Sequence, residues 1–123
     1  MKRVVLMSIH PEFANAILDG TKTIEFRRRP IATDITDGLI YSTSPVKAIT
    51  GELSISEQVI YCPQYMWAKF GHLGGIDRKR FFSYFKDSPQ AVGIIIESAR
   101  RFTTPRELPK GVKAPMSFLY LHI

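Results

Sequence analysis

The sequence predicts an α+β domain, in which a sheet of several strands carries a few short helices. Its 123 residues suit a single domain, residues 1–123, that is large enough to bury a hydrophobic core. Apolar runs rich in β-branched and aromatic residues recur along the whole chain, a pattern typical of strands. Between them lie three short segments that begin at a helix-starting residue and carry apolar side chains at helical spacing.

The predicted strands follow the apolar runs. The first run, residues 3–9, is almost continuously apolar, which is typical of a strand that lies inside a sheet. Gly51 interrupts the longest run, where a glycine indicates a bulge or a bend of a curled sheet. The predicted strands are residues 3–9, 23–27, 39–43, 46–60, 91–98 and 116–123.

The predicted helices begin and end at characteristic residues. The first begins at Pro11 and ends at Gly20, because proline suits the first turn of a helix and glycine suits the left-handed residue after the last one. The second spans residues 63–70, and its Trp67 is expected to pack in the core. The third follows Asp77, whose carboxylate can cap free backbone amides, and its phenylalanines are expected to face the core.

Three segments are predicted to be irregular. Residues 30–38 are rich in Thr, Asp and Gly, and residues 103–115 hold three prolines among basic residues, so both are expected to cross the surface as loops. Residues 71–75 contain three glycines and are expected to form a flexible connection. They lack the lysine and the strand-to-helix setting of a phosphate-binding loop.

The charge of the chain favours a polyanionic partner. Seventeen Lys and Arg against eleven Asp and Glu give a net charge of +6. Such an excess attracts nucleic acid and speeds the encounter with it. It also lies in the range that simply keeps a small domain in solution, so charge alone does not decide between these interpretations.

Cysteine and histidine usage indicates neither a disulfide nor a metal centre. A single cysteine, Cys62, excludes an intrachain disulfide and favours a reducing cytoplasm. The three histidines are far apart and show no paired spacing of metal ligands. No apolar run approaches the roughly 20 residues that span a bilayer, and the opening residues lack the apolar run of a signal peptide.

The strongest candidate site lies on the predicted strand 23–27 and the residue before it. Alternation places Glu25 and Arg27 on one face, and Ile24 and Phe26 on the core face. Together with Lys22, this face offers an ammonium, a carboxylate and a guanidinium that can hold a phosphate, a carbonyl or a base edge. Glu25 is expected to form ion pairs with the cations. The alternative is a charged strand face that is simply exposed to solvent.

Basic residues outside this strand form a second candidate surface. Arg28 and Arg29 continue the charged stretch, and Arg78, Lys79 and Arg80 open the third predicted helix. These side chains can contact the backbone of a nucleic acid. The alternative is again an ordinary solvated face.

Several short motifs, in this order and spacing, resemble the ASCH family within the PUA-like superfamily. The run 8–20 leads into Gly20-x-Lys22-x-x-Glu25-x-Arg27, which is similar to the family signature Gly-x-Lys-x-x-Glu-x-Arg after a short helix. Further similar segments are residues 40–51, 81–85 and 115–120. The resemblance implies a small curled β-barrel with flanking helices and a cleft that Lys22, Glu25 and Arg27 line, with Tyr84 and Ser117 as further ligand-binding candidates.

The resemblance also implies two kinds of function. One is RNA or nucleotide binding, including regulatory roles in RNA metabolism or transcription. The other is hydrolysis of RNA, as in a ribonuclease, or of a modified nucleoside, as in the members that deacetylate N4-acetylcytidine with a Lys, a Thr and a distant Glu. Lys22 matches that lysine and would be the catalytic base or nucleophile, but Glu25 occupies the place of the threonine, and no glutamate lies between Glu57 and Glu97. The resemblance implies no cofactor and no oligomeric state.

Overall fold

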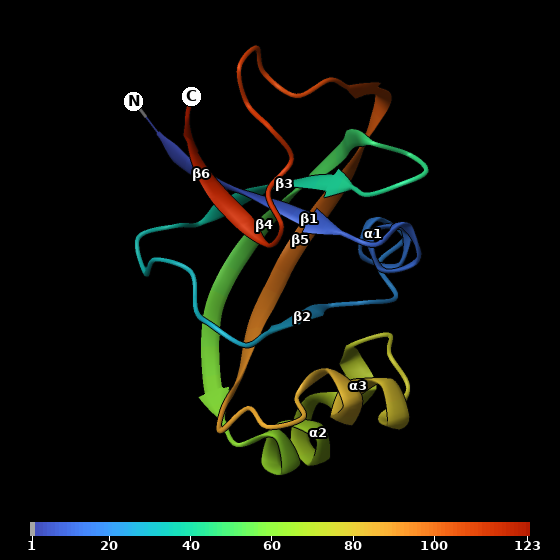
Figure 1. Ribbon diagram of the computed structural model, residues 1–123, viewed down its shortest axis with the longest axis vertical. Helices are drawn as coiled ribbons and strands as arrows, with labels where there is room; N and C mark the ends of the chain where they lie inside the picture. Colours follow the sequence, from blue (N-terminus) through green and yellow to red (C-terminus); the bar gives the residue numbers. More distant parts are fainter. Residues whose placement is uncertain (1) are drawn as a thin grey trace.

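The computed structural model describes residues 2–123 and has the predicted α+β organisation, with one twisted sheet and short helices at its lower end and side (Figure 1). The strands are β1 (Arg3–Ile9), β2 (Ile24–Arg27), β3 (Asp37–Ser42), β4 (Ala48–Tyr61), β5 (Ala91–Arg106) and β6 (Phe118–His122). The helices are α1 (Pro11–Leu18), α2 (Pro63–Phe70) and α3 (Arg78–Tyr84), with a 3-10 turn, η1 (Gly71–Leu73), after α2.

The strands form one six-stranded sheet in the order β2-β5-β4-β3-β1-β6. β1 and β3 are parallel, and α1 and β2 lie on the connection between them, whereas the other pairs are antiparallel. Within residues 2–123 the sheet ends at β2 on one edge and at β6 on the other. The sheet is therefore open, and the closed barrel that the resemblance implies is not shown.

The two longest strands, β4 and β5, pair with each other, and a bulge interrupts β4 as expected near Gly51. Ile40 pairs with Gly51 and Tyr41 pairs with Ile49, so Thr50 is an extra residue without a partner in β3. Its buried hydroxyl lies 2.7 Å from the hydroxyl of Ser42, which satisfies both groups. The prediction of a bulge or bend at this glycine is confirmed.

The helices cover the end of the sheet that carries β2. There, rings from the strand and from α3 form an aromatic cluster, in which Phe26 and Phe81 meet edge to face at 4.9 Å between ring centroids. Trp67 of α2 lies 5.1 Å from Phe81, so its predicted role in core packing is confirmed. Asp77 caps α3 by accepting a hydrogen bond from the amide of Arg80 at 2.8 Å. No helix within residues 2–123 has the length and apolar character to cross a membrane.

Two of the predicted irregular segments contain more structure than expected. The segment 30–38 was expected to be a surface loop, but Ile31 and Ile35 are buried in the core and β3 already begins at Asp37. The predicted flexible connection 71–75 begins with η1, and Gly71 and Gly74 are buried. In residues 30–38, the two buried isoleucines stand among polar residues, so the composition did not indicate that they pack in the core. In residues 71–75, packing against residues such as Phe26 orders the glycines.

The prediction of a loop at residues 103–115 is wrong in its first part. β5 continues to Arg106, well beyond the apolar run that ends at Ser98. The extension pairs with the bulged start of β4, where Gly51 faces Arg101 and Ile49 faces Arg106. The register shifts between these two pairs, so Pro105 lies in an irregular stretch of the strand that tolerates a residue without an N–H donor.

Candidate functional site

A turn after α1 positions Lys22 at the entrance of β2. Gly20 adopts the left-handed conformation, with φ of 85°, that ends the helix. The amides of Thr21 and Lys22 then both donate to the carbonyl oxygen of Ala16 at 3.0 Å. The Lys22 ammonium donates to the carbonyl oxygen of Gly74 at 2.5 Å, which ties β2 to the glycine turn before α3.

Lys22, Glu25 and Arg27, called the charged trio below, meet inside the protein. Glu25 lies 3.3 Å from the Lys22 ammonium through Oε1 and 2.8 Å from the Arg27 guanidinium through Oε2. The three residues are only 3%, 7% and 8% exposed. The predicted ion pairs of Glu25 are confirmed, and the alternative of a solvated charged face is wrong for this strand.

The charges of the trio keep its carboxylate ionised. Burial raises the pKa of Glu25, but the nearby positive charges of Arg27 and Lys22 and their hydrogen bonds outweigh this effect and lower its pKa below the usual value. Two cations and one anion leave the trio with one net positive charge. The carboxylate of Glu25 therefore stays ionised between its two cationic neighbours near neutral pH.

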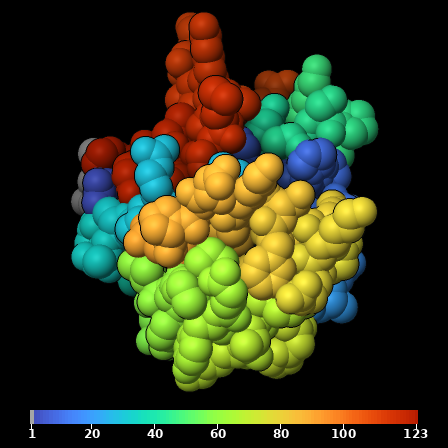
Figure 2. Space-filling view, turned by 60° about the horizontal axis from the view of Figure 1, so that its bottom comes forward, coloured from blue at the N-terminus to red at the C-terminus, as the bar shows by residue number. Residues whose placement is uncertain are grey.

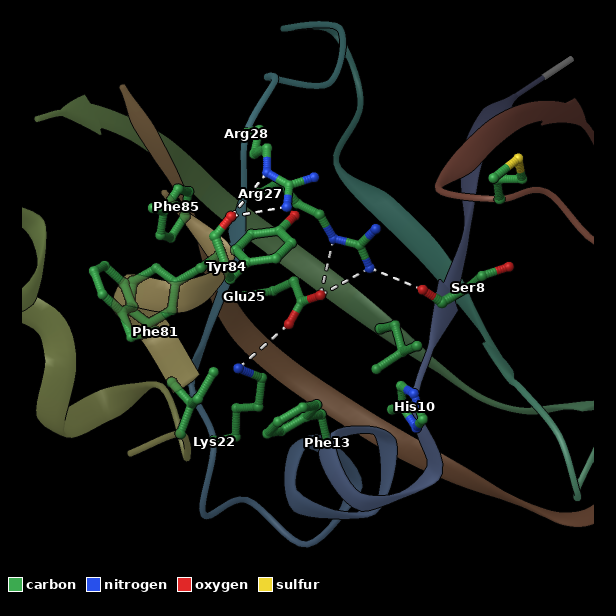
Figure 3. Close-up of a pocket in the computed structure, with 14 residues that line it drawn as sticks. Ser8, His10, Phe13, Lys22, Glu25, Arg27, Arg28, Phe81, Tyr84 and Phe85 are labelled. Atoms are coloured by element: carbon green, nitrogen blue, oxygen red, sulfur yellow. Dashed lines mark hydrogen bonds and ion pairs between the residues drawn. The ribbon is translucent and has the colours of Figure 1, made fainter. Parts of the chain in front are cut away.

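Arg27 connects three segments of the chain. Besides Glu25, its guanidinium donates to the carbonyl oxygen of Ser8 at 3.0 Å (Figure 3) and to the hydroxyl of Ser117 at 3.1 Å. Ser8 in turn donates from its hydroxyl to the carbonyl oxygen of Pro115 at 2.6 Å. These contacts hold the segment before β6 against β1. Ser117 therefore belongs to the site because it accepts a hydrogen bond from Arg27.

The trio lies beside a cavity of about 320 Å³, called the pocket below. Its polar side is formed by the trio, and its apolar sides come mainly from aromatic rings (Figure 3). Such a combination of convergent polar groups and rings is typical of small-molecule sites. The rings belong to Phe13 of α1, Phe26 of β2, Phe81 and Tyr84 of α3, and Phe85.

The rim of the pocket carries Arg28, His10 and Met116. The Arg28 guanidinium lies over the ring of Tyr84 at 4.1 Å and donates twice to the Tyr84 carbonyl oxygen, at 2.8 and 3.0 Å. Met116 is fully exposed although it is apolar. In Figure 2, the cyan segment after β2, the golden-yellow end of α3 and the red segment before β6 converge on the face turned forward.

The other predicted contact residues lie on the surface outside the pocket. Arg29, Arg78, Lys79 and Arg80 are exposed, and Arg80 forms an ion pair with Glu12 at 3.1 Å. The structure therefore brings Lys22, Glu25, Arg27, Tyr84 and Ser117 together and leaves the basic residues of α3 beside the site.

Several pocket residues had no signal that pointed to them. Phe13 resembled an ordinary core residue of an amphipathic helix, and Gly74, which does not line the pocket itself, contributes only a backbone carbonyl oxygen to Lys22. His10 follows the predicted strand 3–9 and Met116 begins the predicted strand 116–123, and the two residues come together at the pocket only in the folded chain. In the part of the chain that the structure describes, no cluster of three or more His, Cys, Asp or Glu could hold a metal ion.

A wider depression of about 500 Å³ lies elsewhere on the sheet. Its charged groups are already paired with one another, Lys2 with Asp37 at 2.5 Å and Arg100 with Glu52 at 2.7 Å. None of the predicted site residues lines it. The pocket beside the trio is therefore the better candidate site.

Comparisons with known proteins show what this chain is similar to. A family model described as the ASCH domain matches residues 7–97. The ASCH domain-containing ribonuclease of Zymomonas mobilis is 30% identical over 96 residues, which cover 77% of this chain and 65% of that protein. Large ribosomal subunit protein uL22 of Ureaplasma parvum is 24% identical over 120 residues, which cover 95% of this chain but only 39% of that protein. The chain thus spans less than two thirds of the length of either relative.

Solved structures show the same fold. The crystal structure of ASCH from Zymomonas mobilis matches with a TM-score of 0.89 and 28% identity, over 97% of this chain and 87% of that chain. A single-residue variant of that protein matches with a TM-score of 0.90 and 26% identity, over 98% of this chain and 91% of that chain.

Proposed function

This chain belongs to the ASCH domain family, and from that premise we propose that it binds RNA and takes one nucleotide of a strand into the pocket. The observation that carries the proposal is the buried charged trio beside an aromatic-walled cavity of about 320 Å³. The relative that is 30% identical is named a ribonuclease, which supports RNA as the partner.

The size and walls of the pocket suit a single nucleotide. A volume of about 320 Å³ is at the lower end of the range of small-molecule sites, which are roughly 300 to 1,000 Å³. Aromatic side chains such as Tyr84 and Phe13 offer faces on which a base can stack, an interaction that contributes about 1 to 3 kcal/mol per base in single-stranded complexes. We place the activity in a reducing cytoplasm, which the single cysteine favours.

The surface beside the pocket suits the phosphates of a strand. Arg28 lies at the rim, and Arg29, Arg78 and Lys79 are exposed and have no ion pair in the described structure. The net charge of +6 adds a long-range attraction. A strand whose base enters the pocket would therefore meet positive charge at the rim and on the neighbouring surface.

A second candidate function is cleavage of the bound strand, which the name of the Zymomonas mobilis relative favours. Cleavage by the neighbouring 2′-hydroxyl requires a group that takes its proton and a positive charge near the phosphate. Lys22 can supply the charge, but the lowered pKa of Glu25 makes that carboxylate a weak base. The weak basicity of Glu25 thus favours binding over cleavage. Deacetylation of N4-acetylcytidine is also disfavoured, because Glu25 occupies the position at which those enzymes have a threonine.

The experiment is an affinity measurement with a fluorescent single-stranded RNA of mixed sequence. We expect binding that weakens about 50-fold between about 50 and about 200 mM salt if roughly four phosphates are contacted. An absence of binding at the lower salt, or an affinity that does not change with salt, would contradict the proposal. The same mixtures are then resolved by length, and fragments that appear with the parent protein but not with Lys22→Ala would establish cleavage.

A further inference from the structure

Every nitrogen of the Arg27 guanidinium is engaged by acceptors of the described residues. Its five N–H groups face four acceptor atoms. Nε donates to Glu25 Oε2, which also lies 2.8 Å from Nη2. Nη2 donates to the carbonyl oxygen of Ser8, and Nη1 donates to the hydroxyl and the carbonyl oxygen of Ser117. Arg27 therefore acts as a positioning residue that fixes Glu25 and the segment before β6.

The other two members of the trio each keep one unused hydrogen-bonding position. Lys22 has three N–H donors and contacts two acceptors in the described chain, the carbonyl oxygen of Gly74 and Glu25 Oε1. Glu25 Oε1 faces only Lys22, whereas Oε2 is occupied twice by Arg27. One donor and one acceptor thus remain, on atoms 3.3 Å apart that line the pocket.

We propose that Lys22 and Glu25 read the hydrogen-bonding edge of a nucleobase at which an acceptor atom lies next to a donor. Every standard base has such an edge, for example the O4 and N3–H of uracil or the N3 and N4 amine of cytosine. The inference rests on the proposed function and names the part of the RNA that reaches the trio. The free N–H of Lys22 would meet the acceptor of the base, and Glu25 Oε1 would meet its donor. Figure 3 shows these two side chains pointing toward each other.

A phosphate fits this position poorly. A phosphate brings several acceptor oxygens and no donor, so it can use only the single free N–H of Lys22. The ionised Glu25 carboxylate, 3.3 Å from that ammonium, would repel its charge. The trio thus offers the pocket one hydrogen-bond donor beside one acceptor. This pair suits the uncharged edge of a base better than a phosphate.

Arg28 at the rim has the donors that a phosphate needs. Two of its five N–H groups are engaged with the carbonyl oxygen of Tyr84, which leaves three free. Its stacking on the Tyr84 ring at 4.1 Å holds the guanidinium plane in place. In this proposal different residues recognise the base and the phosphate of one nucleotide: Lys22 and Glu25 contact the base, and Arg28 contacts the phosphate.

The first test uses the unaltered protein and competition against labelled RNA. The competitors are the four nucleosides, ribose 5-phosphate, and the best nucleoside carrying a methyl group on the ring nitrogen of its hydrogen-bonding edge. We expect a nucleoside to compete better than ribose 5-phosphate, and its methylated form to bind about ten- to a hundredfold more weakly. Competition by ribose 5-phosphate alone, or equal affinity for both forms of the nucleoside, would overturn the proposal.

The second test uses Glu25→Gln, for which base-edge recognition and phosphate recognition predict opposite effects. The amide keeps the shape of the side chain but leaves one oxygen for both cations, so the free acceptor is lost and the positive charge rises. Base-edge recognition predicts that nucleoside affinity falls about tenfold or more, whereas phosphate recognition predicts that ribose 5-phosphate affinity rises. Glu12→Gln is the matched control because it adds the same charge at an exposed ion pair.

The two proposals fail in different ways. If RNA binds with the expected salt dependence but no nucleoside competes, the base-edge inference is wrong and the RNA-binding function stands. If RNA does not bind at low salt, the RNA-binding function is wrong. Thermal unfolding shows whether Glu25→Gln is folded, and a variant that is not folded leaves the decision to the competition with the unaltered protein.

Discussion

Lys22 donates a hydrogen bond of 2.5 Å to the carbonyl oxygen of Gly74, although the two residues are 52 positions apart in the chain. Lys22 stands at the start of β2, and Gly74 lies between η1 and α3, so one buried ammonium joins the strand to the helices that wall the pocket. The same ammonium contacts Glu25. The shape of the pocket and the charge of the trio therefore depend on one side chain.

Replacing Lys22 by methionine is expected to lower the free energy of unfolding by about 1 to 3 kcal/mol. The change removes a buried donor and leaves the carbonyl oxygen of Gly74 without its partner, while Glu25 keeps Arg27. Denaturant unfolding measures the loss. Lys79→Met is the control, because Lys79 is exposed and such changes usually stay within about 0.5 kcal/mol. Equal losses in the two variants would contradict the structural role of Lys22.

Protonation of Glu25 is expected to destabilise the fold in acid. Burial raises its pKa, but Arg27 and Lys22 lower it by more, so the folded pKa lies below the usual 4.5 of the unfolded chain. The stabilisation is complete above that usual value and is lost as the pH falls through the folded pKa. Unfolding measured between about pH 7 and about pH 3 should therefore show a smaller acid loss in Glu25→Gln than in the parent protein.

The control for this pH dependence is Glu12→Gln. A hydrogen bond from Arg80 lowers the pKa of Glu12, but this carboxylate is exposed to solvent, which screens the interaction. We expect Glu12→Gln to keep almost the whole acid loss of the parent. If both variants lose the same part of the pH dependence, the buried trio is not its main source.

Arg28→Gln is expected to weaken RNA binding and to reduce its salt dependence. The substitution removes one phosphate contact, so the slope of log affinity against log salt should fall by about one, with little change in sequence preference. Titrations at several salt concentrations measure the slope. Arg100→Gln carries the same loss of charge but lies outside the pocket and is paired with Glu52. A slope change of equal size in this variant would contradict a specific role of Arg28.

Gly74→Ala tests how closely the glycine turn packs against β2. A Cβ atom at this position would overlap the ring of Phe26, so the turn or the ring must move. We expect a loss of about 1 to 3 kcal/mol in unfolding free energy and a weaker ligand affinity, because the partner of Lys22 is displaced. Gly111→Ala is the control: its Cβ would meet no atom within 4 Å, and only its positive φ of 82° adds strain.

The strands were largely predictable because apolar runs persist wherever a strand crosses the core. The observed limits of β1 and β4 lie within two residues of the predicted ones, because the apolar side chains of these strands are themselves typical of a strand. The second half of β5 was not predictable. Its residues 99–106 are mostly basic or polar, and they remain extended because they pair with the bulged start of β4, a contact that no local pattern encodes.

The sequence predicted which residues form the charged trio, but it did not predict that these residues are buried. Alternation correctly placed Glu25 and Arg27 on one face of β2. That this face is covered depends on Ser117, which is 90 positions from Arg27, and on rings of α3 that reach it only in the folded chain. A strand pattern reports which residues share a face, and it cannot report which distant segment closes over that face.

The position of β2 at the edge of the sheet has a consequence for local unfolding. Among the described residues this four-residue strand pairs only with β5, whereas β4 pairs with β5 along nearly its whole length and with β3 over residues 48–54. Short edge elements open at a lower free energy than central ones, so amide hydrogens of β2 should exchange with solvent faster than those in the middle of β4. The charged trio would then be dismantled and rebuilt many times during the life of a molecule whose central strands stay closed, and a bound ligand would slow the exchange in β2 most.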